Sequence, residues 1–275
     1  MNKLFSKSFM PAMLCGMLCI SVSCNSANSN SANTIEAENV ANPTSKTVVK
    51  RKLAYYKAIR TTGAFDVYFT QTNKASSIRI EGAKEDVESV TWNIDKNGVL
   101  NIGQRTFDRN FFKGRNKHEL KVYVASPDLI AITSTGAGDV KVVSALDTDV
   151  LRIEQKGAGD VEFEKSLICD QLFVTLYGAG DADLNNVTAQ TVQLELYGAG
   201  DMDVNSLRAE KADIKLQGAG DIDVKLDKAG TVNSTLYGVG TIELEGTVNA
   251  VNVKRFGSGN IDTSKLRVMT GRRPR

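Results

Sequence analysis

The tetrapeptide Gly-Ala-Gly-Asp recurs at nearly constant spacing along the second half of the chain. Five identical copies and two degenerate ones begin at Gly136, Gly157, Gly178, Gly198, Gly218, Gly238 and Gly257. The steps between successive first glycines are 21, 21, 20, 20, 20 and 19 residues. A period of this length is typical of solenoids, in which each repeat is one structural unit that stacks on its neighbours.

Apolar and polar residues alternate on both sides of each first glycine, which indicates β-strands and not helices. Positions four and six before the glycine, and four and six after it, are apolar in nearly every copy, with Ser234 and Thr263 as polar exceptions. A strand alternates faces with a period of two residues, so all four positions are buried together only if equivalent residues of successive coils stack. The sequence therefore predicts an all-β fold, a β-helix or solenoid of stacked coils of about 20 residues.

We expect the glycines to form the corners of the coils, where the backbone needs a positive φ angle or approaches the next coil closely. The predicted β-helix domain covers residues 51–270, with regular repeats over residues 129–266. Residues 51–128 are strand-like but less regular. We expect irregular coils there that cap the stack, and a separate small domain is the alternative. Residues 87–92 fit either a short helix or a strand.

Residues 1–23 are typical of a bacterial lipoprotein signal peptide. Two lysines precede an apolar run over residues 9–20, which is shorter than the about 20 residues of a transmembrane helix. Small residues stand just before Cys24 as in a lipobox, although Ser21 occupies the position where leucine is usual. We therefore predict that Cys24 is lipidated and anchors the protein to a membrane. Cleavage that releases a free protein is the alternative.

Residues 24–50 are rich in Asn, Ser, Ala, Thr and Glu and are predicted to form a flexible tether. Cys169 is then the one cysteine left besides Cys24, so neither a disulfide scaffold nor a cysteine metal site is expected, and Cys169 is interpreted as a buried filler. Basic and acidic residues nearly balance at 34 and 32. No nucleic-acid partner is indicated, because the basic stretches lack aromatic interleaving of a kind suited to stacking bases.

Two outward columns of the predicted coils are acidic. Like charges on adjacent coils lie about 4.8 Å apart and repel, so a compensating interaction is expected. Either each repeat aspartate accepts backbone N–H groups at its own corner, or the columns bind divalent cations such as calcium, or a ligand. The sequence leaves the identity of any metal open. The candidate cation or ligand face consists of Asp139, Asp160, Asp181, Asp201 and Asp221, three residues after the first glycine, and Asp183, Asp203 and Asp223, five after it.

A third outward column, one residue before each first glycine, is aromatic in its later copies. Stacked aromatic residues on adjacent strands stabilise a sheet, but an exposed aromatic strip also binds sugar rings. The candidate contact strip consists of Tyr177, Tyr197, Tyr237 and Phe256.

Catalytic machinery is difficult to assemble from this sequence. His118 is the one histidine, which excludes histidine-based triads and multi-histidine metal sites. The strongest enzyme alternative is a polysaccharide-acting β-helix lyase or glycosidase that uses an outward pair such as Asp181 and Asp183. An active site needs one coil unlike its neighbours, whereas these acids repeat on coil after coil. We therefore predict that the protein is not an enzyme and needs no cofactor other than, on the cation hypothesis, calcium.

The stretch Gly63-Ala64-Phe65-Asp66-Val67-Tyr68-Phe69, followed by serial Gly-Ala-Gly-Asp units, resembles the putative auto-transporter adhesin, head GIN domain family of Bacteroidetes lipoproteins. The resemblance covers about residues 52–266, and the basic tail after Leu266 departs from it. It implies a β-helical envelope protein with an adhesive role, without assigning binding residues.

The expected function is that of a lipid-anchored, non-catalytic adhesion or ligand-binding module. Its expected partners are the membrane, through the anchor, and a glycan or an extracellular protein. The expected location is the cell envelope at the outer membrane, with the surface or periplasmic orientation left open.

Overall fold

The computed structural model describes residues 46–105 and 120–269. All of them belong to the second of two compact units, Glu36–Arg275. The predicted signal peptide, Cys24 and His118 lie outside the described residues. No helix among the described residues is long and apolar enough to cross a membrane.

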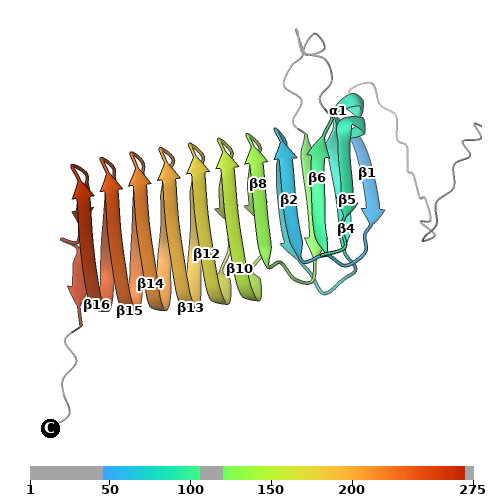
Figure 1. Cartoon of the computed structure of the whole chain (residues 1–275). Helices are drawn as coiled ribbons and strands as arrows, with labels where there is room; N and C mark the ends of the chain where they lie inside the picture. The colour runs from blue at the N-terminus through green and yellow to red at the C-terminus, as the bar shows by residue number, and fades with distance from the viewer. Residues whose placement is uncertain (1–45, 106–119, 270–275) are drawn as a thin grey trace, which may run out of the picture. The chain divides into compact units, whose positions relative to one another are not determined.

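The described chain is almost entirely β-strand (Figure 1). The elements that precede the repeats are β1 (Thr47–Lys52), β2 (Ala58–Gly63), β3 (Asp66–Gln71), β4 (Ser77–Gly82), α1 (Lys84–Ser89), β5 (Val90–Ile94), β6 (Val99–Gln104) and β7 (Lys121–Ser126). The repeats contain β8 (Ala131–Gly136), β9 (Val140–Val142), β10 (Leu146–Gly157), β11 (Val161–Phe163), β12 (Leu167–Gly178), β13 (Ala182–Gly198), β14 (Met202–Gly218), β15 (Asp221–Gly238), β16 (Thr241–Gly257), β17 (Asn260–Asp262) and β18 (Leu266–Val268).

Equivalent positions of successive repeats pair in parallel, in register, from one coil to the next. Gly136 pairs with Gly157, Gly157 with Gly178, and this register continues through all seven first glycines to Gly257. The predicted solenoid with coils of about 20 residues is therefore confirmed. A strand one residue out of register would turn its apolar positions to solvent, so the apolar columns and this register support each other.

The pairing of each long strand with the next divides into three stretches. In strand β13, residues 182–185 follow the Asp corner, residues 187–189 come next, and residues 191–198 end at the first glycine. We call this last stretch the glycine side. In Figure 1 it is the row of parallel arrows from β8 to β16, and β2 and β6 extend the same row.

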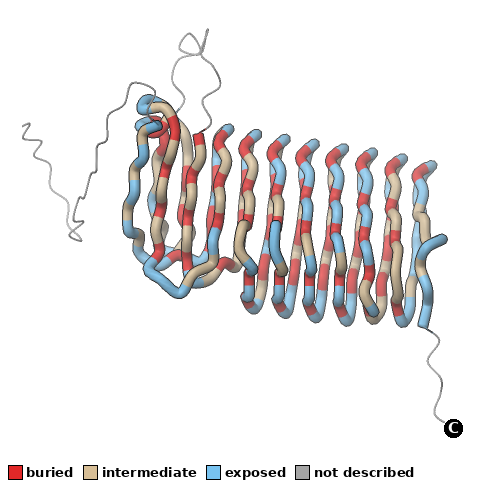
Figure 2. Tube along the Cα trace, turned by 180° about the vertical axis from the view of Figure 1, so that it is seen from behind, coloured by how far each residue is buried: buried red, intermediate tan, exposed pale blue. Residues whose placement is uncertain are grey.

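The core runs through the inside of the coils as stacked apolar columns (Figure 2). The four predicted columns are buried along most of the stack. An inward column two residues before the first glycine was not predicted, and it contains Leu176, Leu196, Leu216 and Leu236. In the last coil Val253 is 51% exposed, because no described strand pairs with the outer edge of residues 250–257.

The residues before the repeats continue the same stack and close its end. Strand β2 pairs in parallel with β8, with Gly63 opposite Gly136, and β3 pairs with β9. Antiparallel pairs β1–β4, β4–β7 and β5–β6 and the short helix α1 complete this end. Residues 47–50, expected in the tether, instead lie in β1 and pair with β4. Residues 87–92 divide between the helix and strand β5.

Candidate binding face

The aspartates of the repeat bond from one coil to the next along one corner of the solenoid. The Oδ1 atom of Asp139 accepts the backbone N–H of Asp160 at 3.0 Å, and Asp160 accepts from Asp181 at 3.0 Å. The same bond joins Asp181 to Asp201 and Asp201 to Asp221, at 2.8 and 3.0 Å. We call these five residues the aspartate ladder.

The ladder extends into the degenerate repeats and into the capping strands. Asp221 accepts the N–H of Thr241 at 2.8 Å, and Asp66 accepts that of Asp139 at 3.3 Å. The prediction that repeat aspartates accept backbone N–H groups is therefore right, but the expected partner is wrong. Each carboxylate binds the equivalent residue of the next coil and not its own corner, because parallel coils place that N–H directly beside it.

The second acidic column lies two residues further along the chain. Near one end of the column, its members Lys141 and Glu162 form an ion pair at 2.6 Å. Near the other end, its member Glu243 forms an ion pair with Lys265, also at 2.6 Å. Its middle members are Asp183, Asp203 and Asp223. Partial burial raises the pKa of these three carboxyls above the ordinary value, and neighbouring carboxylates raise it further.

The two acidic columns do not converge on a metal-binding geometry within the described part of the chain. No group of three or more His, Cys, Asp or Glu side chains there comes close enough together to hold a metal ion. Cys169 is buried, and burial raises the pKa of its thiol to about 11, as expected for an inert filler.

The aromatic column lies on the glycine side and consists of two stacked pairs. The Tyr177 and Tyr197 ring centroids are 5.1 Å apart with 12° between the ring planes, and those of Tyr237 and Phe256 are 4.8 Å apart with 9°. Tyr177, Tyr237 and Phe256 are 42%, 41% and 52% exposed, so the column presents apolar ring surface to solvent. The four residues of the predicted contact strip therefore share one face, but they do not form one continuous stack.

Gln217 separates the two aromatic pairs, since it pairs with Tyr197 on one side and Tyr237 on the other. Lys215 reaches into this interval. Its Nζ donates to the Tyr197 hydroxyl at 3.0 Å, and it lies 4.9 Å from the Tyr197 ring centroid and 5.9 Å from that of Tyr237. This hydrogen bond raises the pKa of Lys215. We call the space between the two rings the tyrosine slot.

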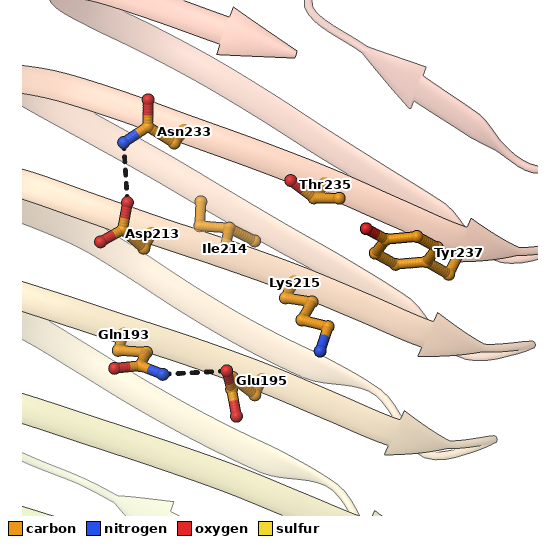
Figure 3. A pocket seen from close by; sticks show the side chains of 8 residues that line it. All are labelled: Gln193, Glu195, Asp213, Ile214, Lys215, Asn233, Thr235 and Tyr237. Carbon is orange, nitrogen blue, oxygen red and sulfur yellow. Dashed lines mark hydrogen bonds between the residues drawn. The ribbon is translucent and has the colours of Figure 1, made fainter. Parts of the chain in front are cut away.

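A shallow depression adjoins the slot across strands β13, β14 and β15 (Figure 3). Its rim holds amides and carboxylates that bond in pairs: Gln193 Nε2 donates to Glu195 at 2.9 Å, and Asn233 Nδ2 donates to Asp213 at 2.7 Å. Figure 3 shows Lys215, Thr235 and Tyr237 along one border. The depression is lined by Gln193, Glu195, Asp213, Ile214, Lys215, Asn233, Thr235 and Tyr237.

The sequence indicated the aromatic strip but not the slot or the depression. The signal was present as Gln217, which interrupts the aromatic column. Its meaning depended on the side chain of Lys215 and on the residues two and four positions before Tyr197 and Tyr237, which the stacked coils bring together.

Comparison with known protein families gives one match over most of the chain. The model described as "Putative auto-transporter adhesin, head GIN domain" matches residues 55–229. A search of curated proteins found no match.

Several solved structures share the fold. A crystal structure of a putative adhesin from Bacteroides fragilis is 28% identical, covers 79% of this chain and 96% of its own, and superposes with a TM-score of 0.69. A putative adhesin from Parabacteroides merdae is 18% identical, with coverages of 80% and 96% and a TM-score of 0.65. A putative lipid binding protein from Parabacteroides distasonis is 16% identical, with coverages of 80% and 98% and a TM-score of 0.52.

Proposed function

The chain belongs to the putative auto-transporter adhesin, head GIN domain family, and on that premise we propose that it is a lipid-anchored, non-catalytic adhesion module of the cell envelope. Membership in an adhesin family fits a protein of the cell surface or envelope. The proposal adds an anchor at Cys24 in the outer membrane, a tether, and a rigid solenoid that presents its outward columns to a partner.

The exposed glycine side carries this proposal. A binding module needs a preformed surface with aromatic and hydrogen-bonding groups, and the glycine side presents exposed rings beside paired amides and carboxylates. These groups lie on paired β-strands, so their spacing is fixed before a partner arrives.

The acidic columns support the same proposal in a different way. The aspartate ladder repeats one hydrogen bond from coil to coil, and no coil within it differs from its neighbours as an active site requires. The ladder therefore acts as structure, by bonding the coils along their corner. We propose that the partner is a glycan or an extracellular protein.

Screening the purified chain against glycans and host matrix proteins tests this function. We expect saturable binding to at least one of them with the bound molecule recovered unchanged. Release of reducing ends or unsaturated products from any polysaccharide would show that the protein is a polysaccharide-acting enzyme. Protease treatment of intact cells gives the orientation, because only a surface-exposed solenoid is accessible to the protease.

A further inference from the structure

The aromatic column of the glycine side has a gap one coil wide. In each stacked pair the ring centroids are separated by about one strand spacing and the ring planes are nearly parallel. The rings therefore lie face to face along the stack of coils. At Gln217 the column lacks a ring, so Tyr197 and Tyr237 stand two strand spacings apart, with Gln217 and the Lys215 ammonium group between them.

The width of this gap selects what fits between the rings. Two strand spacings separate Tyr197 from Tyr237 by about 9.6 Å. Van der Waals contact on both faces uses about 7 to 8 Å of that distance. The gap therefore takes one ring, as the centroid separations of 5.1 and 4.8 Å in the two stacked pairs show, and the polar groups around the slot decide which kind of ring binds.

Lys215 now occupies part of the slot without filling it as a ring would. Its stem is flexible, and its ammonium group is held by one hydrogen bond to Tyr197 and by attraction to two ring faces. An entering ring can displace this side chain toward Glu195, which pairs with Lys215 across the strands. The ammonium group would then be free to donate to a ligand hydroxyl.

The charges around the slot cancel. Lys215 and Lys211 are positive, Glu195 and Asp213 are negative, and Lys211 already pairs with Asp213 at 2.6 Å. The adjoining depression adds Gln193, Asn233 and Thr235. Each amide uses one N–H in its pair with a carboxylate and keeps a second N–H for a ligand. Gln193 also keeps its carbonyl oxygen, whereas the carbonyl oxygen of Asn233 accepts from Asn252 at 2.9 Å. This supply of donors and acceptors without net charge matches a hydroxyl-rich, neutral molecule.

We propose that the tyrosine slot binds one pyranose ring of a neutral saccharide, between the faces of Tyr197 and Tyr237, while the depression beside it binds the hydroxyls of the next sugar unit. This inference rests on the proposed binding function and names its ligand class and site. The ring faces supply apolar contact for the C–H groups of the sugar, and the amides, carboxylates and Lys215 supply its hydrogen bonds.

Replacing Gln217 with Tyr tests the proposal, because it inserts a ring into the gap. The variant is expected to fold, since tyrosines already stack at the equivalent positions of neighbouring coils. The probes are the neutral hexaoses of cellulose, laminarin, mannan and amylose, titrated into the full chain by calorimetry. We expect one or more to bind the wild type and Gln217→Tyr to lower its affinity about tenfold or more. Binding should also shift the NMR signal of the Lys215 ε-methylene group.

Tyr55→Ala is the matched control, because it removes an exposed tyrosine ring before the repeats, outside the aromatic column. Its affinity should equal that of the wild type. Unchanged affinity in Gln217→Tyr, or equal losses in Gln217→Tyr and Tyr55→Ala, would overturn the slot while leaving a glycan-binding function in place. If none of the four hexaoses binds the wild type, the saccharide slot is wrong, and the adhesive function is then judged by matrix-protein binding.

Discussion

Asp201 shows how one residue type stabilises the corner of a coil on the outside of the solenoid. Its Oδ1 atom accepts the N–H of Asp221, and its own N–H donates to Asp181. The carboxylate thereby satisfies a backbone donor that points along the stack. Thr241 ends the run by donating its N–H to Asp221.

We predict that Asp201→Asn has little effect on the free energy of unfolding, because the amide oxygen still accepts the N–H of Asp221. Asp201→Ala should lower it by about 1 kcal/mol, because that N–H loses its acceptor. Thermal or urea melts of the two variants measure this difference. Equal stability of the Ala and Asn variants would show that the coil-to-coil bond contributes nothing.

The same variants decide whether calcium binds the acidic columns. Because the carboxylates act as hydrogen-bond acceptors, we expect the melting temperature of the wild type to be the same in chelator and in millimolar calcium. A cation ladder predicts the opposite result: calcium raises the melting temperature by mass action, and Asp201→Asn abolishes the rise by removing ligand charge.

Asp203 in the second acidic column gives a pH-dependent prediction. Partial burial and the carboxylates of Asp201 and Asp181 raise its pKa in the folded state, so the folded protein holds this proton more tightly than the unfolded chain. The contribution of Asp203 to stability therefore falls as the pH rises from the ordinary value of aspartate through the raised one. Asp203→Asn should raise the melting temperature at pH 7, with a smaller gain near pH 4.

Asp213 is the matched control with the opposite sign. Burial acts to raise its pKa, but hydrogen bonds from Lys211 and Asn233 outweigh this and leave it lowered. Its stabilising contribution is present at neutral pH and is lost as the pH falls through the lowered pKa. Asp213→Asn should therefore lower the melting temperature at pH 7. A change of the same sign in both variants would show that the local environment does not set these effects.

At the scale of the coil, close backbone stacking explains the second glycine of each repeat. A Cβ atom at Gly200 would lie 2.1 Å from the carbonyl oxygen of Gly180, a contact that only a backbone shift can relieve. Some first glycines have a second reason, a positive φ angle, which is +136° at Gly238. Both reasons predicted from the sequence therefore apply, but close stacking is the one that applies to every glycine of the repeated motif.

We predict that Gly200→Ala destabilises the solenoid by about 3 kcal/mol, the upper part of the usual range for overpacking, because backbone and not a flexible side chain must move. Ala199→Ser is the matched control at the neighbouring exposed position and should change stability by less than about 0.5 kcal/mol. Equilibrium unfolding in urea measures both. A mild effect of Gly200→Ala would mean that adjacent coils separate easily at this corner.

The repeated strands were predictable because identical residues recur at each step, which specifies both the period and the register. The inward leucine column was missed because its first members are Ser134 and Gln155, so the position reads as polar in the early coils. The pairing of Gly63 with Gly136 could not be predicted from the repeat either. Antiparallel strands lie between these two glycines in the chain, and the pairing of those strands depends on contacts between distant segments and not on a period.

At the scale of the whole chain, the repeat explains how a sequence with balanced charge and few aromatic residues builds a long core. Each coil buries its apolar residues mainly against the two coils beside it, so the stack needs an end that closes it. The segment before the repeats provides that end with antiparallel strands and a helix. The glycine side keeps its outward residues exposed along the regular coils, and on the proposed function this continuous face is the surface that binds the partner.

The last prediction concerns Cys24, the residue expected to anchor the protein to the membrane. A small-residue box precedes it, and the residues between Cys24 and the first strand have the low apolar content expected of a tether. Cys24→Ala removes the thiol that would carry lipid, so the protein should move from the membrane fraction to the soluble fraction of cells. Replacing Ser26 with Ala is the matched control and should leave the protein in the membrane. If Cys24→Ala leaves the fractionation unchanged, the protein is not anchored through lipid at this residue, and another segment or a partner must hold it at the envelope.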